Sequence, residues 1–149
     1  MNGPKVTSLG PQDYRRTPWK NGGGVTTDIA HAGEIWRFSR TPITEPGPFS
    51  DYAGFDRAQV LVGGHGLVLE TPDGEIDVRT PFKPVRFAGE FAIVSRLEAG
   101  PVEVLNLLGD RSKVRLDLSV LAVGETRHLG SGLHVAYCPA GSARMRLGK

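Results

Sequence analysis

The segment AQVLVGGHGLVLETPDGEIDV, residues 58–78, contains the pattern on which the fold prediction depends. Two short apolar runs, Ala58 to Val62 and Gly66 to Glu70, are separated by a glycine-rich turn, and both are predicted to be strands. The sequence TPDG, Thr71 to Gly74, is typical of a tight turn and leads into a third run that begins at Ile76. The segment is therefore predicted to contain a β-hairpin.

The rest of the chain has the same character. Its 20 glycines and 11 prolines leave apolar runs of only a few residues, and no window of a dozen residues has helical periodicity. Ten or so short strands without helices predict an all-β fold, an antiparallel sandwich or barrel. Further strands are predicted at residues 25–30 and 35–40 and at Val85 to Phe87, Phe91 to Arg96, Val102 to Leu108, Val114 to Val123, Glu125 to Leu129 and Leu133 to Cys138.

Bulk composition limits the classes of protein to consider. With 149 residues, 39% of them apolar and 23% charged, the chain is predicted to form one packed domain, residues 1–149. The net charge of +2 comes from scattered basic residues, which does not fit a nucleic-acid binder. No apolar run approaches the roughly 20 residues of a membrane helix. A single cysteine, Cys138, and the lack of a charged-then-apolar leader predict a cytoplasmic protein.

Metal binding and nucleophilic catalysis have little support in the sequence. No histidine forms a close pair with another or has a carboxylate at ligand spacing, so neither a metal nor another cofactor is expected. Ser50 lies outside the GxSxG pattern of serine hydrolases, and nothing near His134 and Cys138 completes a catalytic triad. No catalytic residue is assigned. The four histidines are His31, His65, His128 and His134.

The sequence WKNGGG, Trp19 to Gly24, precedes a predicted strand. Lys20 comes before the glycines, not after them as in a Walker motif, and no GxGxxG opens a helix, so a nucleotide site is not predicted. Consecutive glycines indicate positive φ angles or a close backbone approach. Two interpretations remain: a glycine-rich entry into a strand, or a ligand site to which Trp19, Lys20 and Asn21 contribute. A plain turn does not need these flanking side chains, so they favour a ligand site.

Two arginines indicate an anion site. Arg37 shares the polar face of a predicted strand with Ser39, and Arg57 begins another strand. If the sheet closes, these faces turn inward and line a cavity, where a guanidinium binds a carboxylate through two parallel hydrogen bonds. The alternative is a set of weak surface ion pairs, Arg37 with Asp28 or Glu34, and Arg57 with the aspartate before it.

The order of these motifs resembles the HutD/Ves family. Looser similarity continues through 63–69, 87–90 and the region around Asn106 and Arg111, so the resemblance spans about Tyr14 to Arg115. Each motif alone is weak, but four in one order are specific. The four motifs are Trp19 to Gly24 with Thr26, Trp36 to Ser39, Gly47 to Ser50, and Gly54 to Arg57.

This resemblance implies a cupin-type, bicupin-like fold in a bacterial cytoplasmic protein. It implies binding of a small carboxylate metabolite, such as formylglutamate, urocanate or formate, that regulates histidine utilisation. By motif, Arg57 corresponds to the family's pocket arginine, and the tryptophan-arginine motif supplies Arg37. The expected ligand-binding residues are Trp19, Lys20, Asn21, Gly22, Gly23, Thr26, Arg37, Ser39, Phe49, Ser50 and Arg57.

The chain departs from the family pattern in two places. The region after Arg115 is shorter than in other members, so the C-terminal end of the fold is expected to be abbreviated. Apolar Val104 and Leu105 replace an acidic residue expected shortly before Asn106. Both departures bear on the identity of the ligand more than on the fold.

Two other functions remain open from the sequence. One is a metal-free cupin enzyme, an isomerase or hydrolase, in which Asp28 or Glu34 accepts a proton; a carboxylate in the pocket with a raised pKa would favour it. The other is a β module for protein interaction, which predicts no concave polar pocket near Arg57. Of the macromolecular partners considered, only a second copy of the chain remains, because no nucleic acid or membrane is expected.

Overall fold

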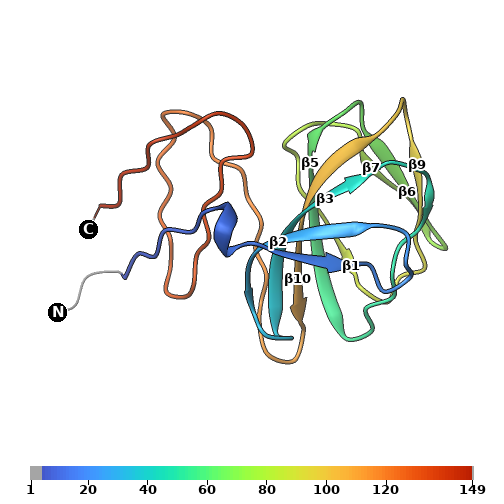
Figure 1. Ribbon diagram of the computed structural model, residues 1–149, viewed down its shortest axis with the longest axis horizontal. Coiled ribbons are helices and arrows are strands. Elements are labelled where there is room, and N and C mark those ends of the chain that lie inside the picture. The colour runs from blue at the N-terminus through green and yellow to red at the C-terminus, as the bar shows by residue number, and fades with distance from the viewer. Residues whose placement is uncertain (1–4, 149) are drawn as a thin grey trace.

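The computed structural model describes residues 5–148 and has an all-β architecture. Two antiparallel sheets face each other, one with the strand order β1-β2-β3-β10-β5-β8 and the other with the order β4-β9-β6-β7 (Figure 1). Neither sheet closes into a barrel. The strands are β1 (Arg15–Pro18), β2 (Val25–Ala32), β3 (Trp36–Ile43), β4 (Gly47–Pro48), β5 (Phe55–Gly63), β6 (Leu67–Thr71), β7 (Gly74–Val78), β8 (Val85–Ala88), β9 (Val94–Leu97) and β10 (Val102–Asp110).

The segment 58–78 forms the predicted strands. Strands β6 and β7 pair as a hairpin across the turn from Thr71 to Gly74, as expected. The preceding turn depends on two glycines with positive φ, Gly64 at 85° and Gly66 at 103°. A Cβ at Gly64 would lie 2.5 Å from the carbonyl oxygen of Pro101, so only glycine fits there. This turn allows the chain to leave one sheet and enter the other.

The main core lies between the two sheets, and both sheets contribute buried side chains to it. Alternate residues of each strand point inward, as the period of two along a strand requires. Trp19 and Phe49 pack against the edge of this core. The buried members are Ile43, Leu61, Leu67, Leu69, Val78, Phe87, Ile93, Val102 and Val104.

The other face of the six-stranded sheet has a smaller apolar cluster. Part of the segment that follows β10 covers it: the Tyr137 ring lies edge-on to Phe38, with the ring centroids 6.0 Å apart. Arg40 fixes this contact by donating hydrogen bonds to the Tyr137 hydroxyl at 3.1 Å and to the Pro139 carbonyl at 2.7 Å. Leu118 also packs there.

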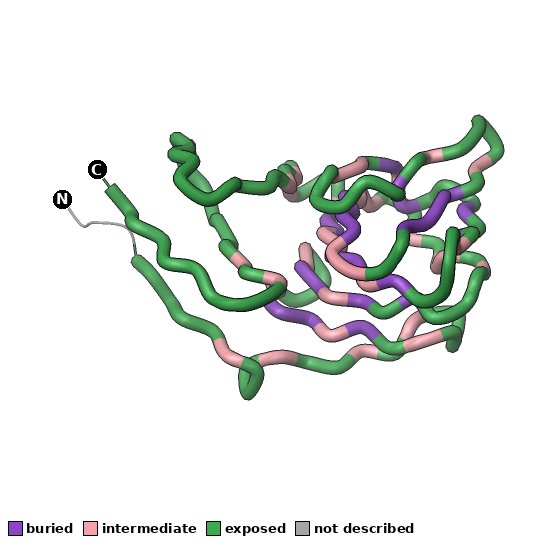
Figure 2. The backbone as a smooth tube through the Cα atoms, turned by 90° about the horizontal axis from the view of Figure 1, so that it is seen from above, coloured by how far each residue is buried: buried purple, intermediate pink, exposed green. Residues whose placement is uncertain are grey.

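Three predicted strands are wrong: no strand forms in Val114–Val123, Glu125–Leu129 or Leu133–Cys138. The chain from Arg111 onward runs beside the sandwich in irregular loops, and most of it is exposed (Figures 1 and 2). These segments have suitable residues but no partner strand, and β propensity reflects packing against neighbours more than an intrinsic preference. Two short strands, β1 and β4, were not predicted. Within residues 5–148 the helical element is a three-residue turn, and none is long and apolar enough to cross a membrane.

Candidate functional site

The register of the six-stranded sheet gathers polar side chains on its inner face. Asn106 on the central strand β10 lies opposite Ser39 of β3 and Gln59 of β5. Arg37 lies two residues from Ser39 on β3, and Arg57 lies two residues from Gln59 on β5. The two arginines are therefore on the same face of the sheet and flank β10 from either side. Antiparallel pairing thus brings together residues that are far apart in the sequence.

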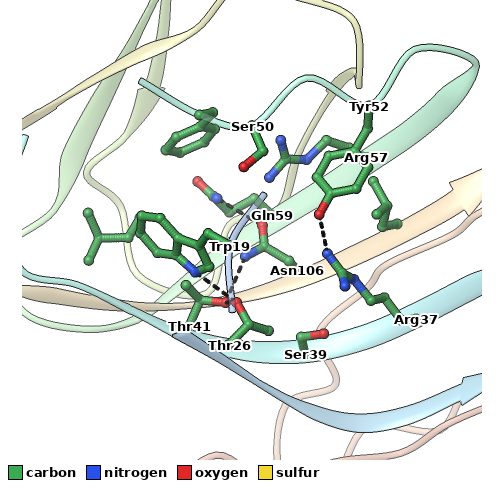
Figure 3. Close-up of a pocket in the computed structure, with 13 residues that line it drawn as sticks. Trp19, Thr26, Arg37, Ser39, Thr41, Ser50, Tyr52, Arg57, Gln59 and Asn106 are labelled. Atoms are coloured by element: carbon green, nitrogen blue, oxygen red, sulfur yellow. Dashed lines mark hydrogen bonds between the residues drawn. The ribbon is translucent and has the colours of Figure 1, made fainter. Parts of the chain in front are cut away.

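These side chains line a pocket (Figure 3). Seven of the residues expected to bind a ligand line it: Trp19, Thr26, Arg37, Ser39, Phe49, Ser50 and Arg57. Four others, Lys20, Asn21, Gly22 and Gly23, lie outside the lining. Six lining residues were not assigned from the sequence: Thr41, Ile43, Tyr52, Gln59, Asn106 and Leu108.

Arg57 is the most unusual residue of the pocket. Its guanidinium lies over three aromatic rings, 5.2 Å from the centroid of Phe49, 5.6 Å from that of Tyr52 and 5.2 Å from that of Phe87. Burial lowers the pKa of Arg57 to about 10, helped by the positive charge of Arg37 and opposed by Tyr52. The group stays protonated at neutral pH. In residues 5–148 it has neither an ion pair nor a hydrogen-bond acceptor.

Two further cations surround Tyr52. Arg37 Nη2 donates a hydrogen bond to the Tyr52 hydroxyl at 2.6 Å, and Lys20 Nζ lies 4.6 Å from the centre of the ring. Lys20 also donates to the carbonyl oxygen of Asp51 at 3.1 Å. No carboxylate in the described part of the chain pairs with Lys20, Arg37 or Arg57, so the mouth of the pocket has an excess of positive charge. The ion pairs considered for Arg37 do not form.

Asp28 lies beside the pocket but already has several partners. Its buried carboxylate accepts hydrogen bonds from Arg15 at 3.0 Å, Thr17 at 2.7 Å and Ser39 at 2.6 Å. Burial opposes ionisation, but these hydrogen bonds outweigh it and lower the pKa of Asp28. A carboxylate held in this way is a poor proton acceptor. Glu34, the other candidate, is exposed in the turn after β2 and does not line the pocket.

Asp56 pairs with a residue other than Arg57. The Nε of Arg111 lies 2.7 Å from Asp56 Oδ1, and the same guanidinium bonds both oxygens of Glu90, at 3.0 and 3.1 Å. Arg111 also donates to the carbonyl oxygen of Phe55 at 3.0 Å. These acceptors raise the pKa of Arg111. The surface pair between Arg57 and Asp56, considered above as the alternative to an anion site, does not form, because Asp56 pairs with Arg111.

The glycine run positions Trp19. Gly22 has a positive φ of 76°, and a Cβ on Gly24 would lie 2.9 Å from the Trp19 ring. Asn21 anchors the turn to the next loop by donating to the Pro48 carbonyl at 2.9 Å. The prediction that these glycines need positive φ angles or a close backbone approach is thus confirmed. The group that the backbone approaches is the Trp19 ring. The glycines do not line the pocket themselves, but they position Trp19, which forms one of its walls.

A chain of hydrogen-bonded side chains forms the floor of the pocket (Figure 3). Trp19 Nε1 donates to Thr26 Oγ1 at 3.1 Å, and Thr26 Oγ1 lies 2.8 Å from Thr41 Oγ1. Asn106 Nδ2 lies 3.4 Å from Thr41 Oγ1, and Gln59 Nε2 lies 2.9 Å from Asn106 Oδ1. Gln59 Oε1 is buried and has no partner among the described residues. The period of two along β5 could have linked Gln59 to Arg57 from the sequence.

Comparison with known proteins shows the family. The family model HutD matches residues 11–149. The chain belongs to the HutD family. A Pseudomonas putida protein named for its position, an uncharacterized 21.2 kDa protein in the hutC 3' region, is 37% identical over 106 residues. That match covers 67% of this HutD chain and 56% of the relative, and it fits the family's association with the histidine utilisation locus.

Solved structures agree with this assignment. A conserved protein of unknown function from Pseudomonas aeruginosa PAO1 is 33% identical, with a TM-score of 0.63 over 68% of this HutD chain and 54% of the other. HutD from Pseudomonas fluorescens SBW25, in a structure described as the formate condition, is 34% identical, with a TM-score of 0.61 over 68% and 59%. The chain therefore spans little more than half the length of these relatives. A cupin-superfamily protein from Silicibacter pomeroyi, 16% identical with a TM-score of 0.52 over 69% and 75%, supports the cupin-type fold alone.

A metal centre has no candidate ligands in this HutD chain within residues 5–148, where no three His, Cys, Asp or Glu side chains gather. The polar groups of the pocket are instead guanidinium, hydroxyl, indole and carboxamide groups. Such groups recognise an anion and its hydrogen-bonding atoms. The arrangement is suited to binding.

Proposed function

We propose that this protein binds a small carboxylate in the pocket, with Arg57 as the principal anion-binding residue. The observation that supports the proposal is the Arg57 guanidinium, which lies in the pocket without an anionic partner from the described residues. Buried charges in proteins are normally paired, so a cation without a partner indicates a ligand of opposite charge.

The surroundings of Arg57 would strengthen such a contact. Aromatic rings lie on several sides of the guanidinium, and charge-assisted hydrogen bonds are stronger where the local dielectric is low. Arg37 and Lys20 add positive charge beside Tyr52 and would attract the same anion. A carboxylate matches the planar fork of a guanidinium, which can donate two parallel hydrogen bonds to it.

The ligands proposed for testing are formylglutamate, urocanate and formate. The family's association with histidine utilisation supports the choice, because the resemblance described above connects the family with metabolites of that pathway. In this proposal, binding of the metabolite regulates the pathway, and no reaction is catalysed. The single exposed cysteine, Cys138, fits a reducing compartment, and the proposal places the protein in the cytoplasm.

Calorimetric titration of the wild type, Arg57→Ala and Arg57→Lys with each of the three carboxylates tests the proposal. A charge-assisted hydrogen bond contributes about 1.5 to 3 kcal/mol, so Arg57→Ala should weaken binding about tenfold to a hundredfold. Arg57→Lys should restore only part of the affinity, because an ammonium keeps the charge but lacks the fork. Equal affinities for all three proteins would refute the role of Arg57.

A further inference from the structure

The chain that follows β10 leaves many apolar side chains in contact with solvent. It runs beside the sandwich and is mostly exposed (Figures 1 and 2). Eight of the 15 large apolar side chains that are exposed in the described residues lie in this part of the chain. Leu133, for example, keeps 73% of its surface exposed. The eight are Val120, Leu121, Val123, Leu129, Leu133, Val135, Met145 and Leu147.

The total surface of the chain is larger than that of a compact monomer of the same mass. A folded monomer of 16.0 kDa should expose about 7,400 Å². The chain exposes 10153 Å², which is about 2,800 Å² more. A standard protein–protein interface covers only about 800 Å² on each partner. The excess is therefore large enough to supply one side of a stable interface.

The backbone after β10 is largely unpaired. Between residues 115 and 148, a single hydrogen bond joins two backbone groups, from the Glu125 amide to the Ala122 carbonyl oxygen at 3.0 Å. Residues 133–138 make none, although Phe38 and Arg40 hold Tyr137 against the six-stranded sheet. This stretch is therefore anchored to the sandwich by a side chain, while its own amide and carbonyl groups remain available for pairing.

The sequence of this stretch favours a second copy of the same chain as its partner. Residues 128–143 contain no Asp, Glu, Lys or Arg. Charged side chains normally protect an exposed strand edge from pairing with another chain, and that protection is missing here. In a twofold pair the stretch faces itself, so a charge on it would lie near the same charge of the other copy. An uncharged stretch avoids this repulsion.

We propose that two copies of the chain associate through residues 133–138, which pair antiparallel, backbone to backbone, across a twofold axis. Each copy supplies the neighbouring strand that the other lacks. Leu133 and Val135, exposed in the single chain, then have apolar neighbours across the pair. The same surface is used on both copies, so the contact is closed. The inference is independent of the proposed function, because none of these residues lines the pocket.

Sedimentation equilibrium tests the association. The wild type should have twice the 16.0 kDa mass of the chain. Leu133→Glu should weaken the dimer at least about tenfold, because it removes an apolar contact from each copy and adds like charges. Val6→Glu is the matched control, since Val6 is 67% exposed and lies outside the interface, and it should leave the dimer unchanged. A monomer at every concentration, or equal association of the two variants, would overturn the proposal.

Amide hydrogen exchange tests the pairing of the backbone. Amides within residues 133–138 should exchange rapidly in dilute protein and become protected as the concentration rises, because only the dimer gives them acceptors. Amides of β10 are the internal control, since their partners in β3 and β5 belong to the same copy. Protection of 133–138 that is independent of concentration would show pairing within one copy. Rapid exchange in a dimeric sample would place the interface elsewhere, and either result overturns the proposal.

Discussion

Arg111 and Arg57 lie in neighbouring regions of the molecule and have opposite surroundings. The Arg111 guanidinium is half-exposed and contacts two carboxylates and a carbonyl oxygen. The Arg57 guanidinium lies among aromatic rings and has no such acceptor in residues 5–148. Asp56 and Arg57 are consecutive on β5 and face opposite sides of the sheet, so Asp56 is within reach of Arg111 and out of reach of Arg57.

The difference shows how hydrogen-bond acceptors distinguish two kinds of charged residue. One kind supports the fold, and the other is available to bind a ligand. Arg111 ties the segment that follows β10 to the first residues of β5 and to the loop after β8, a role that needs its acceptors in place. Arg57 contributes no comparable contact to the fold, and burial makes its charge unfavourable, as its lowered pKa indicates. Ligand binding and stability should therefore respond in opposite ways to changes at the two arginines.

The largest expected effect is on stabilisation by a ligand. A carboxylate at about a hundred times its dissociation constant should stabilise the wild type by about 2.7 kcal/mol and raise its Tm accordingly. Arg111→Ala should show the same rise from a lower starting Tm, whereas Arg57→Ala should show little or none. Differential scanning fluorimetry with and without formate measures this. A full ligand-induced rise in Arg57→Ala would remove the distinction between the two regions.

Asp28 extends the comparison to a buried charge that has partners. Because hydrogen bonds lower its pKa in the folded protein, its contribution to stability is present above the ordinary pKa of 3.8 and is lost as the pH falls below that value. Asp28→Asn should lower the free energy of unfolding by about 2 kcal/mol at neutral pH. The difference in the free energy of unfolding between the wild type and Asp28→Asn should narrow from about pH 5 to about pH 3, as measured by urea unfolding. A gap independent of pH would show that the charge of Asp28 does not matter.

Arg57→Met should stabilise the ligand-free protein. The substitution keeps an unbranched side chain among the aromatic rings and removes a desolvated cation, so the free energy of unfolding should rise by about 1 kcal/mol. Arg111→Met should have the opposite sign, because it leaves Asp56 and Glu90 without their shared partner. Chemical denaturation of both variants checks the two signs. A lower stability for Arg57→Met would mean that Arg57 supports the fold through contacts with the rings.

The smallest expected effect is at the wall of the pocket. In Gly24→Ala the new Cβ would lie 2.9 Å from the Trp19 ring, so the indole must shift and its bond to Thr26 must weaken. Carboxylate affinity should fall about twofold to threefold. Gly47→Ala is the matched control, because a Cβ at Gly47 has nothing within 4 Å. Equal affinities for the two variants in calorimetry would show that the position of Trp19 does not affect binding.

The sequence predicts the sandwich better than the chain that follows it. Alternating apolar residues identified β5, β6 and β7 because each has a neighbour in the sheet and a buried face. The same pattern in Leu133–Cys138 gave no strand, since periodicity does not reveal whether a partner strand exists. The strand β4, with two residues, is too short for any pattern to identify.

Short motifs identified several of the residues that line the pocket. The motifs around Trp19, Arg37 and Arg57 gave residues that line the pocket. Thr41 and Gln59 were missed although each lies two residues beyond an expected site residue on the same strand. Tyr52 could not be found in this way, because it lies in a loop, where side-chain direction follows no period.

The position of β10 has a consequence for synthesis of the protein. It is the last strand of the described chain, yet it lies between β3 and β5 and contributes Asn106 to the pocket floor. As the polypeptide leaves the ribosome, β3 and β5 each expose an unpaired edge until residues 102–110 emerge. The sheet and the pocket are therefore completed together in one late step, and a nascent chain that stalls before Val102 presents two apolar strand edges to the cell's chaperones.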